Sequence, residues 1–145
     1  MQPRIDVITL GVSDLDRALA FYRKLGFESP GIIGTEFKGD ETHPGGAAAM
    51  FQLRGGLILS LYGRADLAKD AGIPVGPSAS GEFSIGYLVP NRGEVDQVLR
   101  TAAAAGATVL GDAADRPWGI YSGYFKDPDG HLWEVIWNPQ SPAAQ

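Results

Sequence analysis

The chain has 145 residues, of which 44% are hydrophobic and 20% are charged, as is typical of a compact soluble protein with a continuous core. Its formal net charge of -5 and its scattered lysines and arginines exclude a nucleic-acid role, because no basic cluster is present to neutralise phosphates. The absence of cysteine excludes disulfides, thiolate catalysis and cysteine-ligated zinc. No apolar run approaches the ~20 residues of a membrane span and no signal-peptide pattern opens the sequence, so we expect a cytoplasmic protein with no membrane partner.

The first half of the chain predicts one strand, one helix and three further strands. Residues 5–12 are rich in β-branched types and predict a strand. Ser13 or Asp14 can then cap a helix whose apolar residues recur at helical spacing until Gly26. Weaker strand patterns follow at 31–39, 47–53 and 56–62, with a turn at residues 54–56 and a short helix at 65–71.

The second half predicts the same order of elements. Residues 72–81 are rich in glycine, proline and serine and predict a linker. A strand at 83–89 leads to a helix that Asn91 can cap and Gly106 can end. Further strands are expected at 107–113, 122–127 and 131–137. We therefore predict a first module at 1–71, the linker at 72–81, a second module at 82–139 and a frayed tail at 140–145.

An internal repeat connects the two halves. At one constant offset Val12 aligns with Val89, Asp14 with Asn91, and Tyr22 with Leu99. At a second offset Phe51 aligns with Phe125, Gly56 with Gly130, and Ser60 with Glu134. Duplication of one supersecondary unit is the architecture that this pattern favours.

Alternation along the strands separates a bulky apolar face from a face of smaller and more polar residues. The second face is predicted to carry Thr9, Gly11, Ser60, Ser84, Gly86 and Glu134. Such a face can line a cleft for a small organic molecule, or it can meet solvent or a second subunit.

Glu134 is the residue of this set that most needs an explanation. It lies in the stretch DPDGHLWEVIWNP, between Trp133 and Val135. A carboxylate in such a strand is normally paired, hydrogen-bonded, changed in pKa or bound to a metal, because an isolated buried charge is costly.

Two stretches resemble the glyoxalase/bleomycin-resistance/extradiol-dioxygenase superfamily, also called vicinal oxygen chelate proteins. They are ITLGVSDLDRALAFYRKLGF and YFKDPDGHLWEVIWNP, and the resemblance extends over residues 5–139. It implies an α+β fold in which two tandem βαβββ modules form a half-open barrel. The repeat agrees with this expectation.

The resemblance also implies four metal-ligand positions, which fall on Val7, Ser84, Ser60 and Glu134. Only Glu134 has a strong ligand for a transition metal, so we expect no metal and no other cofactor. His43 lies in a loop that could fold over the cleft and join Glu134, although a loop histidine is more often solvated. Alternation directs His131 away from Glu134.

Three interpretations remain open. The first is binding or sequestration of a small organic molecule without a metal, in a pocket made by Val7, Thr9, Ser60, Tyr62, Ser84, Trp118, Tyr124 and Glu134. The second is a lyase, isomerase or dioxygenase in which Glu134 acts as general base or as the sole retained metal ligand, since burial raises the pKa of a carboxyl group. Against this catalytic role stands a purely structural one, in which Glu134 joins a buried polar network with Ser60, Ser84 or an arginine such as Arg4. The third is a role only in subunit contact, with the cleft filled by protein. The resemblance further implies a homodimer.

Overall fold

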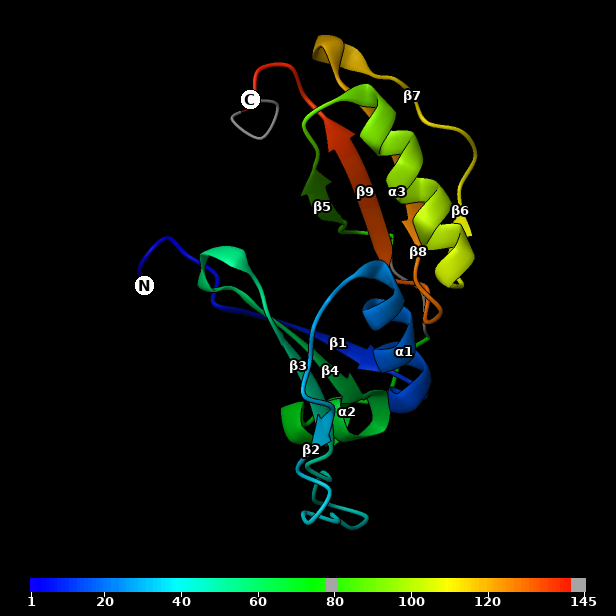
Figure 1. The fold of residues 1–145 in the computed structure, drawn as a ribbon. Coiled ribbons are helices and arrows are strands. Elements are labelled where there is room, and N and C mark those ends of the chain that lie inside the picture. The colour runs from blue at the N-terminus through cyan, green and yellow to red at the C-terminus, as the bar shows by residue number, and fades with distance from the viewer. Residues whose placement is uncertain (78–80, 142–145) are drawn as a thin grey trace. The chain divides into compact units, whose positions relative to one another are not determined.

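The computed structural model describes residues 1–77 and 81–141, and the chain divides into two compact units, Met1–Pro77 and Ser78–Gln145 (Figure 1). Residues 78–80 of the predicted linker and 142–145 of the predicted tail lie outside the described residues. The fold is mixed α and β, as predicted. Each unit contains one sheet and its own hydrophobic core.

The first unit is a βαβββ module followed by a helix. Its elements are β1 (Val7–Val12), α1 (Leu15–Leu25), β2 (Ile32–Ile33), β3 (Ala48–Gln52), a 3-10 turn η1 (Arg54–Gly56), β4 (Ile58–Gly63) and α2 (Arg64–Ala71). The strand order is β1-β4-β3-β2, with β1 parallel to β4 and the other neighbours antiparallel. This order brings the first and last strands of the module together at one side of the sheet.

The second unit repeats that topology. Its elements are β5 (Ile85–Leu88), α3 (Arg92–Ala105), β6 (Thr108–Val109), β7 (Ala114–Asp115), a 3-10 turn η2 (Pro117–Gly119), β8 (Tyr121–Lys126) and β9 (Leu132–Trp137). The order is β5-β9-β8-β6, with β5 parallel to β9 and with β7 also paired to β8. The two βαβββ modules predicted from the sequence are therefore confirmed.

Equivalent residues of the two modules have the same structural roles. Asp14 and Asn91 are the N-caps of α1 and α3, and each side chain accepts a hydrogen bond from the backbone N–H three residues later. Phe51 and Phe125 are both buried. The register also agrees, because Thr9 pairs with Ser60 in the first unit just as Gly86 pairs with Glu134 in the second. Ser60 and Glu134 thus occupy the same place in their modules.

The strand predicted at 83–89 is limited to Ile85–Leu88, and two other predicted strands are reduced to two residues each. The predicted strand at 31–39 contains only the two residues of β2, because Gly34 has a φ of 76° and a side chain there would collide with the carbonyl oxygen of Gly46. The predicted strand at 107–113 contains only β6, and Gly111, with a φ of 76°, ends the extended conformation. The short strand β7 was not predicted.

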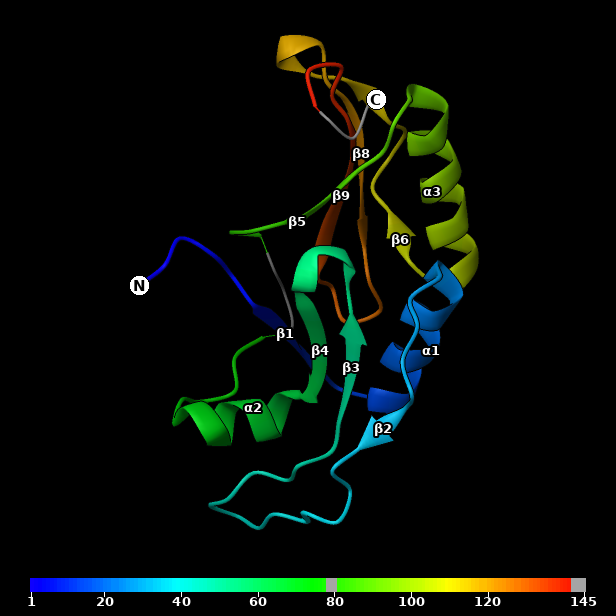
Figure 2. The same cartoon turned by 60° about the vertical axis from the view of Figure 1, so that its left-hand side comes forward.

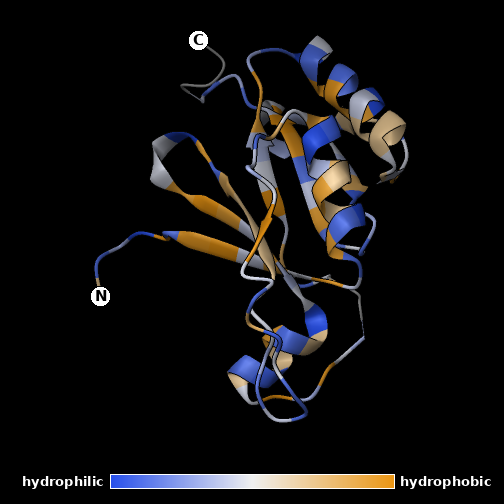
Figure 3. Cartoon of the chain, turned by 60° about the horizontal axis from the view of Figure 1, so that its bottom comes forward, coloured by the Kyte–Doolittle hydropathy of each residue, from blue (hydrophilic) through white to orange (hydrophobic). Residues whose placement is uncertain are grey.

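Each core lies between a sheet and its amphipathic helix. In the first unit α1 packs on β3 and β4, where Tyr22 and Phe51 are fully buried. In the second unit α3 runs along β8 and β9 (Figure 2), and the rings of Phe125 and Trp133 stack at 5.9 Å beneath it. Hydrophobic residues accordingly concentrate on the strands, while the helices alternate between polar and apolar residues (Figure 3).

Candidate functional site

Glu134 lies on the face of the second sheet that α3 does not cover. Its neighbours Trp133 and Val135 are buried on the opposite side, where the helix packs, so alternation directs Glu134 the other way. It pairs with Gly86 on β5 and with Tyr124 on β8. The side chains that share this surface are those of Leu88, Ser122, Tyr124, Lys126, Leu132, Glu134 and Ile136, with Gly86 between them; we call it the Glu134 face.

The carboxylate of Glu134 accepts a hydrogen bond from β8. The Ser122 hydroxyl donates to Glu134 Oε2 at 2.8 Å. Tyr124 lies directly opposite Glu134 in the strand pairing. Burial, followed by the nearby negative charge of Glu134, raises the pKa of the Tyr124 phenol. Like an ordinary tyrosine, it is a protonated donor at neutral pH.

Arg116 reaches the same serine from the other side. Its Nε donates to Ser122 Oγ at 3.2 Å and one terminal nitrogen donates to the Ser122 carbonyl oxygen at 3.2 Å. Its guanidinium carbon lies 5.7 Å from the centre of the Tyr124 ring. One hydroxyl thus separates a guanidinium from a carboxylate, and it accepts from the first while it donates to the second.

The turn between β7 and β8 explains why Arg116 is placed there. Ala114 pairs with Ser122 across the two strands, and the Arg116 N–H donates to the carbonyl oxygen of Ile120 at 2.7 Å. The chain therefore folds back through Pro117–Gly119 and brings Arg116 beside the start of β8. Trp118 lies in this turn with 90% of its surface exposed and with a φ of 66°, which is unusual for a bulky residue.

Tyr121 lies on the opposite face of β8 from Tyr124. Its hydroxyl donates to Asp96 of α3 at 2.8 Å, and Arg92 lies over its ring at 4.2 Å. The hydrogen bond to Asp96, followed by burial, raises the pKa of the Tyr121 phenol. Tyr121 therefore links β8 to α3 through its hydrogen bond to Asp96, and it is not part of the Glu134 face.

The predicted site residues of the first unit lie on two neighbouring strands. Thr9 of β1 is the direct partner of Ser60 on β4, and Val7 is the partner of Ile58. Ser60 is buried, whereas Val7 and Thr9 are exposed. In the second unit the position equivalent to Ser60 is Glu134, that equivalent to Thr9 is Gly86, and that equivalent to Val7 is Ser84. Ser84 is exposed and directly precedes β5.

Tyr62, also predicted in the pocket, is hydrogen-bonded to the loop that contains Gly45. Its hydroxyl donates to the carbonyl oxygen of Gly45. Burial, followed by the charges of Asp66 and Asp70, raises the pKa of its phenol. At this end of the sheet α2 covers the face, because a side chain at Gly11 would lie against Arg64 and Leu67 of that helix.

The two histidines are each paired with a nearby aspartate. Nδ1 of His43 lies 2.9 Å from an Asp40 carboxylate oxygen in an exposed loop. Nδ1 of His131 lies 2.8 Å from Asp127, whose buried carboxylate also accepts the backbone N–H groups of Asp129 and His131. His131 and Asp127 therefore stabilise the turn between β8 and β9.

The donor set at the four ligand positions does not fit a transition metal. Val7 has no donor atom, Ser60 and Ser84 offer only neutral hydroxyls, which are weak ligands, and Glu134 alone of the four is a carboxylate. Within the described parts of the chain, no group of three or more histidine, aspartate or glutamate side chains gathers where it could hold a metal ion.

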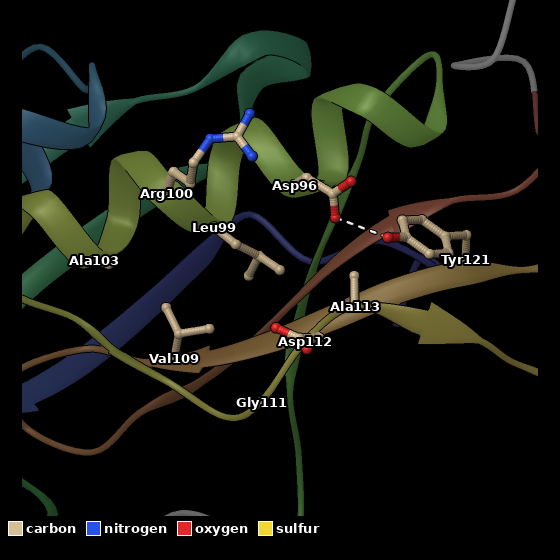
Figure 4. A pocket seen from close by; sticks show the side chains of 9 residues that line it. All are labelled: Asp96, Leu99, Arg100, Ala103, Val109, Gly111, Asp112, Ala113 and Tyr121. Atoms are coloured by element: carbon tan, nitrogen blue, oxygen red, sulfur yellow. Dashed lines mark hydrogen bonds between the residues drawn. The ribbon is translucent and has the colours of Figure 1, made fainter.

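A hollow of about 470 Å³ lies on the helix side of the second sheet, away from Glu134. It is lined by Asp96, Leu99, Arg100, Ala103, Val109, Gly111, Asp112, Ala113 and Tyr121. Figure 4 shows Leu99 and Val109 directed into it and the Asp96–Tyr121 hydrogen bond at one end. None of the side chains predicted for the pocket lines this hollow.

Two residues of the Glu134 network, Arg116 and Ser122, were not predicted as its partners. Ser122 shares the face of Tyr124 because it lies two positions before it on the same strand, so alternation could have found it. Arg116 joins the network only through the tight turn at Pro117–Gly119, and no periodic pattern in the sequence signals that turn.

Comparisons with known proteins agree with this architecture. The family model described as Glyoxalase/Bleomycin resistance protein/Dioxygenase superfamily matches residues 4–135. A glyoxalase-related enzyme from Fulvimarina pelagi is 29% identical, with a TM-score of 0.77 over 94% of this chain and 89% of that one. A lactoylglutathione lyase from Agrobacterium tumefaciens is 27% identical, with a TM-score of 0.62 over 93% of each chain.

A protein from Staphylococcus aureus described as hypothetical, SA1046, shares the fold at 23% identity and a TM-score of 0.71, over 94% of each chain. The search of curated proteins found no match. No helix in the described part of the chain is long and apolar enough to cross a membrane. Since the family model covers most of the sequence, the chain belongs to the glyoxalase/bleomycin resistance protein/dioxygenase superfamily.

Proposed function

We propose that the chain binds a small organic molecule on the Glu134 face of its second unit, without a metal ion. The observation that carries this proposal is the carboxylate of Glu134, which accepts the Ser122 hydroxyl and lies opposite Tyr124, on a sheet face that α3 leaves uncovered. Polar groups fixed in this way among the apolar side chains of Leu88, Leu132 and Ile136 are typical of a small-molecule site.

The mechanism of binding follows from the protonation states. The phenol of Tyr124 stays protonated because its pKa is raised, so it can donate to Glu134 or to a ligand. Glu134 accepts hydrogen bonds from ligand donors that approach from the open side of the face. Leu132 and Ile136 flank it on the same strand and supply apolar contact, so a ligand with a flat or branched hydrocarbon body is favoured.

Metal independence rests on the chemistry of the four ligand positions. A single carboxylate and two serine hydroxyls do not make a site for zinc, nickel or iron, because these metals prefer imidazole, thiolate and several carboxylates. The hydrogen bond that the Ser122 hydroxyl donates to Glu134 gives the carboxylate a partner other than a metal.

A second candidate is a lyase or isomerase in which Glu134 removes a proton from the bound molecule. The pairing of Glu134 with Tyr124 favours it, because a carboxylate beside a protonated phenol can supply a base and an acid on one face. The similarity to an enzyme described as a lactoylglutathione lyase is compatible with this candidate.

Thermal-shift screening of the full chain tests the first candidate. Protein purified without chelators is examined for metal content and then screened against aromatic and antibiotic-like compounds, in parallel with Glu134→Gln and with Glu28→Gln as an exposed control. Stabilisation of the wild type and of Glu28→Gln, but not of Glu134→Gln, supports binding at this face. Equal stabilisation of all three proteins rejects it.

We further propose that the chain forms a homodimer, as its resemblance to two-module relatives implied. Light scattering coupled to size-exclusion chromatography tests this directly. A species of twice the chain mass at micromolar concentration is expected, and a strictly monomeric species over the same range rejects the dimer.

A further inference from the structure

Arg116 has hydrogen-bonding capacity that the fold does not use. A guanidinium has five N–H groups, and within the described residues Arg116 uses two of them, both on Ser122. No carboxylate of the described residues lies within ion-pair distance of it. Since Arg116 is exposed, its remaining N–H groups are available to a ligand.

The guanidinium is also held in one orientation. Two hydrogen bonds to a buried serine and its position over the Tyr124 ring restrict it from two directions. A cation that is fixed before binding loses less side-chain entropy when it pairs with a ligand. A planar guanidinium in such a position suits the planar, two-oxygen geometry of a carboxylate.

One aromatic ring lies beside this cation, and a second aromatic residue follows it closely in the chain. The Tyr124 ring is 5.7 Å from the guanidinium carbon, and Trp118, two residues after Arg116, is 90% exposed. Trp118 has a positive φ, a conformation that costs free energy for a large side chain and that is typical of functional turns. The turn therefore presents one fixed cation and one exposed indole.

We propose that Arg116 is a specificity-determining residue that selects an aromatic carboxylate as the ligand of the Glu134 face. This inference rests on the proposed function, because it assigns the ligand class of the same site. The carboxylate of the ligand pairs with the Arg116 guanidinium, and its ring packs against the Tyr124 ring of β8 or the Trp118 indole of the turn. A donor group on the ring, when present, hydrogen-bonds to Glu134. The Ser122 hydroxyl bridges Glu134 and Arg116, because it accepts from Arg116 and donates to Glu134.

The test uses benzoate and 3-hydroxybenzoate as probes, with benzamide and 3-hydroxybenzamide as neutral isosteres. Their affinities for the full chain are measured by nuclear magnetic resonance titration at two salt concentrations. The carboxylates are expected to bind about tenfold or more tightly than the amides, with the preference falling at high salt. Equal affinities for acid and amide overturn the inference.

The variant Arg116→Gln is expected to lose the preference for the carboxylates while retaining the weaker binding of the amides. Arg116→Lys, which keeps the charge but not the planar pair of donors, is expected to retain only part of it. Arg100→Gln, on α3, carries the same loss of charge and should keep the full preference. Persistence of the preference in Arg116→Gln, or its loss in Lys126→Gln instead, contradicts the assignment.

The same titration separates this inference from the function on which it rests. If the amides and the acids bind equally and Glu134→Gln abolishes both, the small-molecule site stands and the role of Arg116 is wrong. If none of the four probes changes the resonances of Ser122, Tyr124 or Glu134, both the role of Arg116 and the assignment of an aromatic ligand to this face are rejected.

Discussion

Tyr124 on β8 lies directly opposite Glu134 on β9, and the negative charge of the Glu134 carboxylate contributes to the raised pKa of the Tyr124 phenol. The same carboxylate accepts the Ser122 hydroxyl, which in turn accepts a hydrogen bond from Arg116. Glu134 is therefore stabilised by neighbours on one strand and the turn before it, which explains how an apolar strand can carry a charge.

Glu134→Gln should weaken ligand binding while preserving the fold. The amide oxygen of glutamine can still accept the Ser122 hydrogen bond, so the free energy of unfolding should change by less than about 1 kcal/mol. Affinity for a ligand with a hydrogen-bond donor should fall by about 1.5–3 kcal/mol, because bonds to a charged acceptor are stronger. Calorimetric titration and urea unfolding measure the two quantities, and an unchanged affinity would remove Glu134 from the site.

Tyr124→Phe should reduce the loss of stability at alkaline pH. The folded protein raises the pKa of the Tyr124 phenol above 10.0, so the folded state holds this proton more tightly than the unfolded state does. The resulting stability is complete below about pH 10 and is lost as the pH rises through the raised pKa.

Denaturant unfolding from pH 8 upward, with absorbance detection of tyrosinate, measures this dependence. The pKa values of Tyr62 and Tyr121 are also raised, so the wild type should lose stability through several groups and Tyr124→Phe through one fewer. A variant whose curve has the same slope as the wild type above pH 10 contradicts the assignment.

Gly123→Ala should destabilise the second unit. A methyl group at this position would lie 2.5 Å from Leu99 of α3 and 3.3 Å from the backbone of Ala113, so the helix or the strand must move. The expected cost is about 1–3 kcal/mol of unfolding free energy. Gly76→Ala, where a methyl group meets open space, is the matched control and should change stability by less than about 1 kcal/mol.

Asp127→Ala should also be destabilising, since its buried carboxylate accepts the backbone N–H groups of Asp129 and His131. Leaving those groups without a partner should cost about 2–4 kcal/mol. Asp127→Asn keeps one acceptor oxygen and should cost less. The exposed Asp112→Ala serves as control, and equal stability of all three variants in thermal unfolding would refute the role of this turn.

Much of the fold follows from local patterns. The caps at Asp14 and Asn91, the apolar spacing of the helices and the alternation of the last strands are short-range signals, and the structure contains each of them. The predicted strand at 31–39 was too long because Gly34 and Gly46 pack backbone to backbone, which is a tertiary contact that no local pattern encodes. The β7–β8 turn was missed for a different reason: it is a tight local turn closed by the hydrogen bond from the Arg116 N–H to Ile120, and β7 before it is too short to show alternation.

The candidate site could be predicted only in part. Alternation assigns Glu134 and Tyr124 to one face, and the register of β8 and β9 makes them direct partners. The polar partners expected for Glu134 were Ser60, Ser84 or Arg4. Within the second unit its hydrogen-bonding partner is Ser122, and Arg4 pairs with Asp6 in the first unit. The union of the faces of both modules into one cleft stays a prediction from the repeat.

Equilibrium dialysis of the full chain against nickel, zinc, iron and manganese, followed by metal analysis, tests whether the chain binds any of these metals. We expect no stoichiometric uptake of any of these ions, and the same result for wild type and Glu134→Gln. One ion per chain in the wild type, lost in Glu134→Gln, would contradict this expectation.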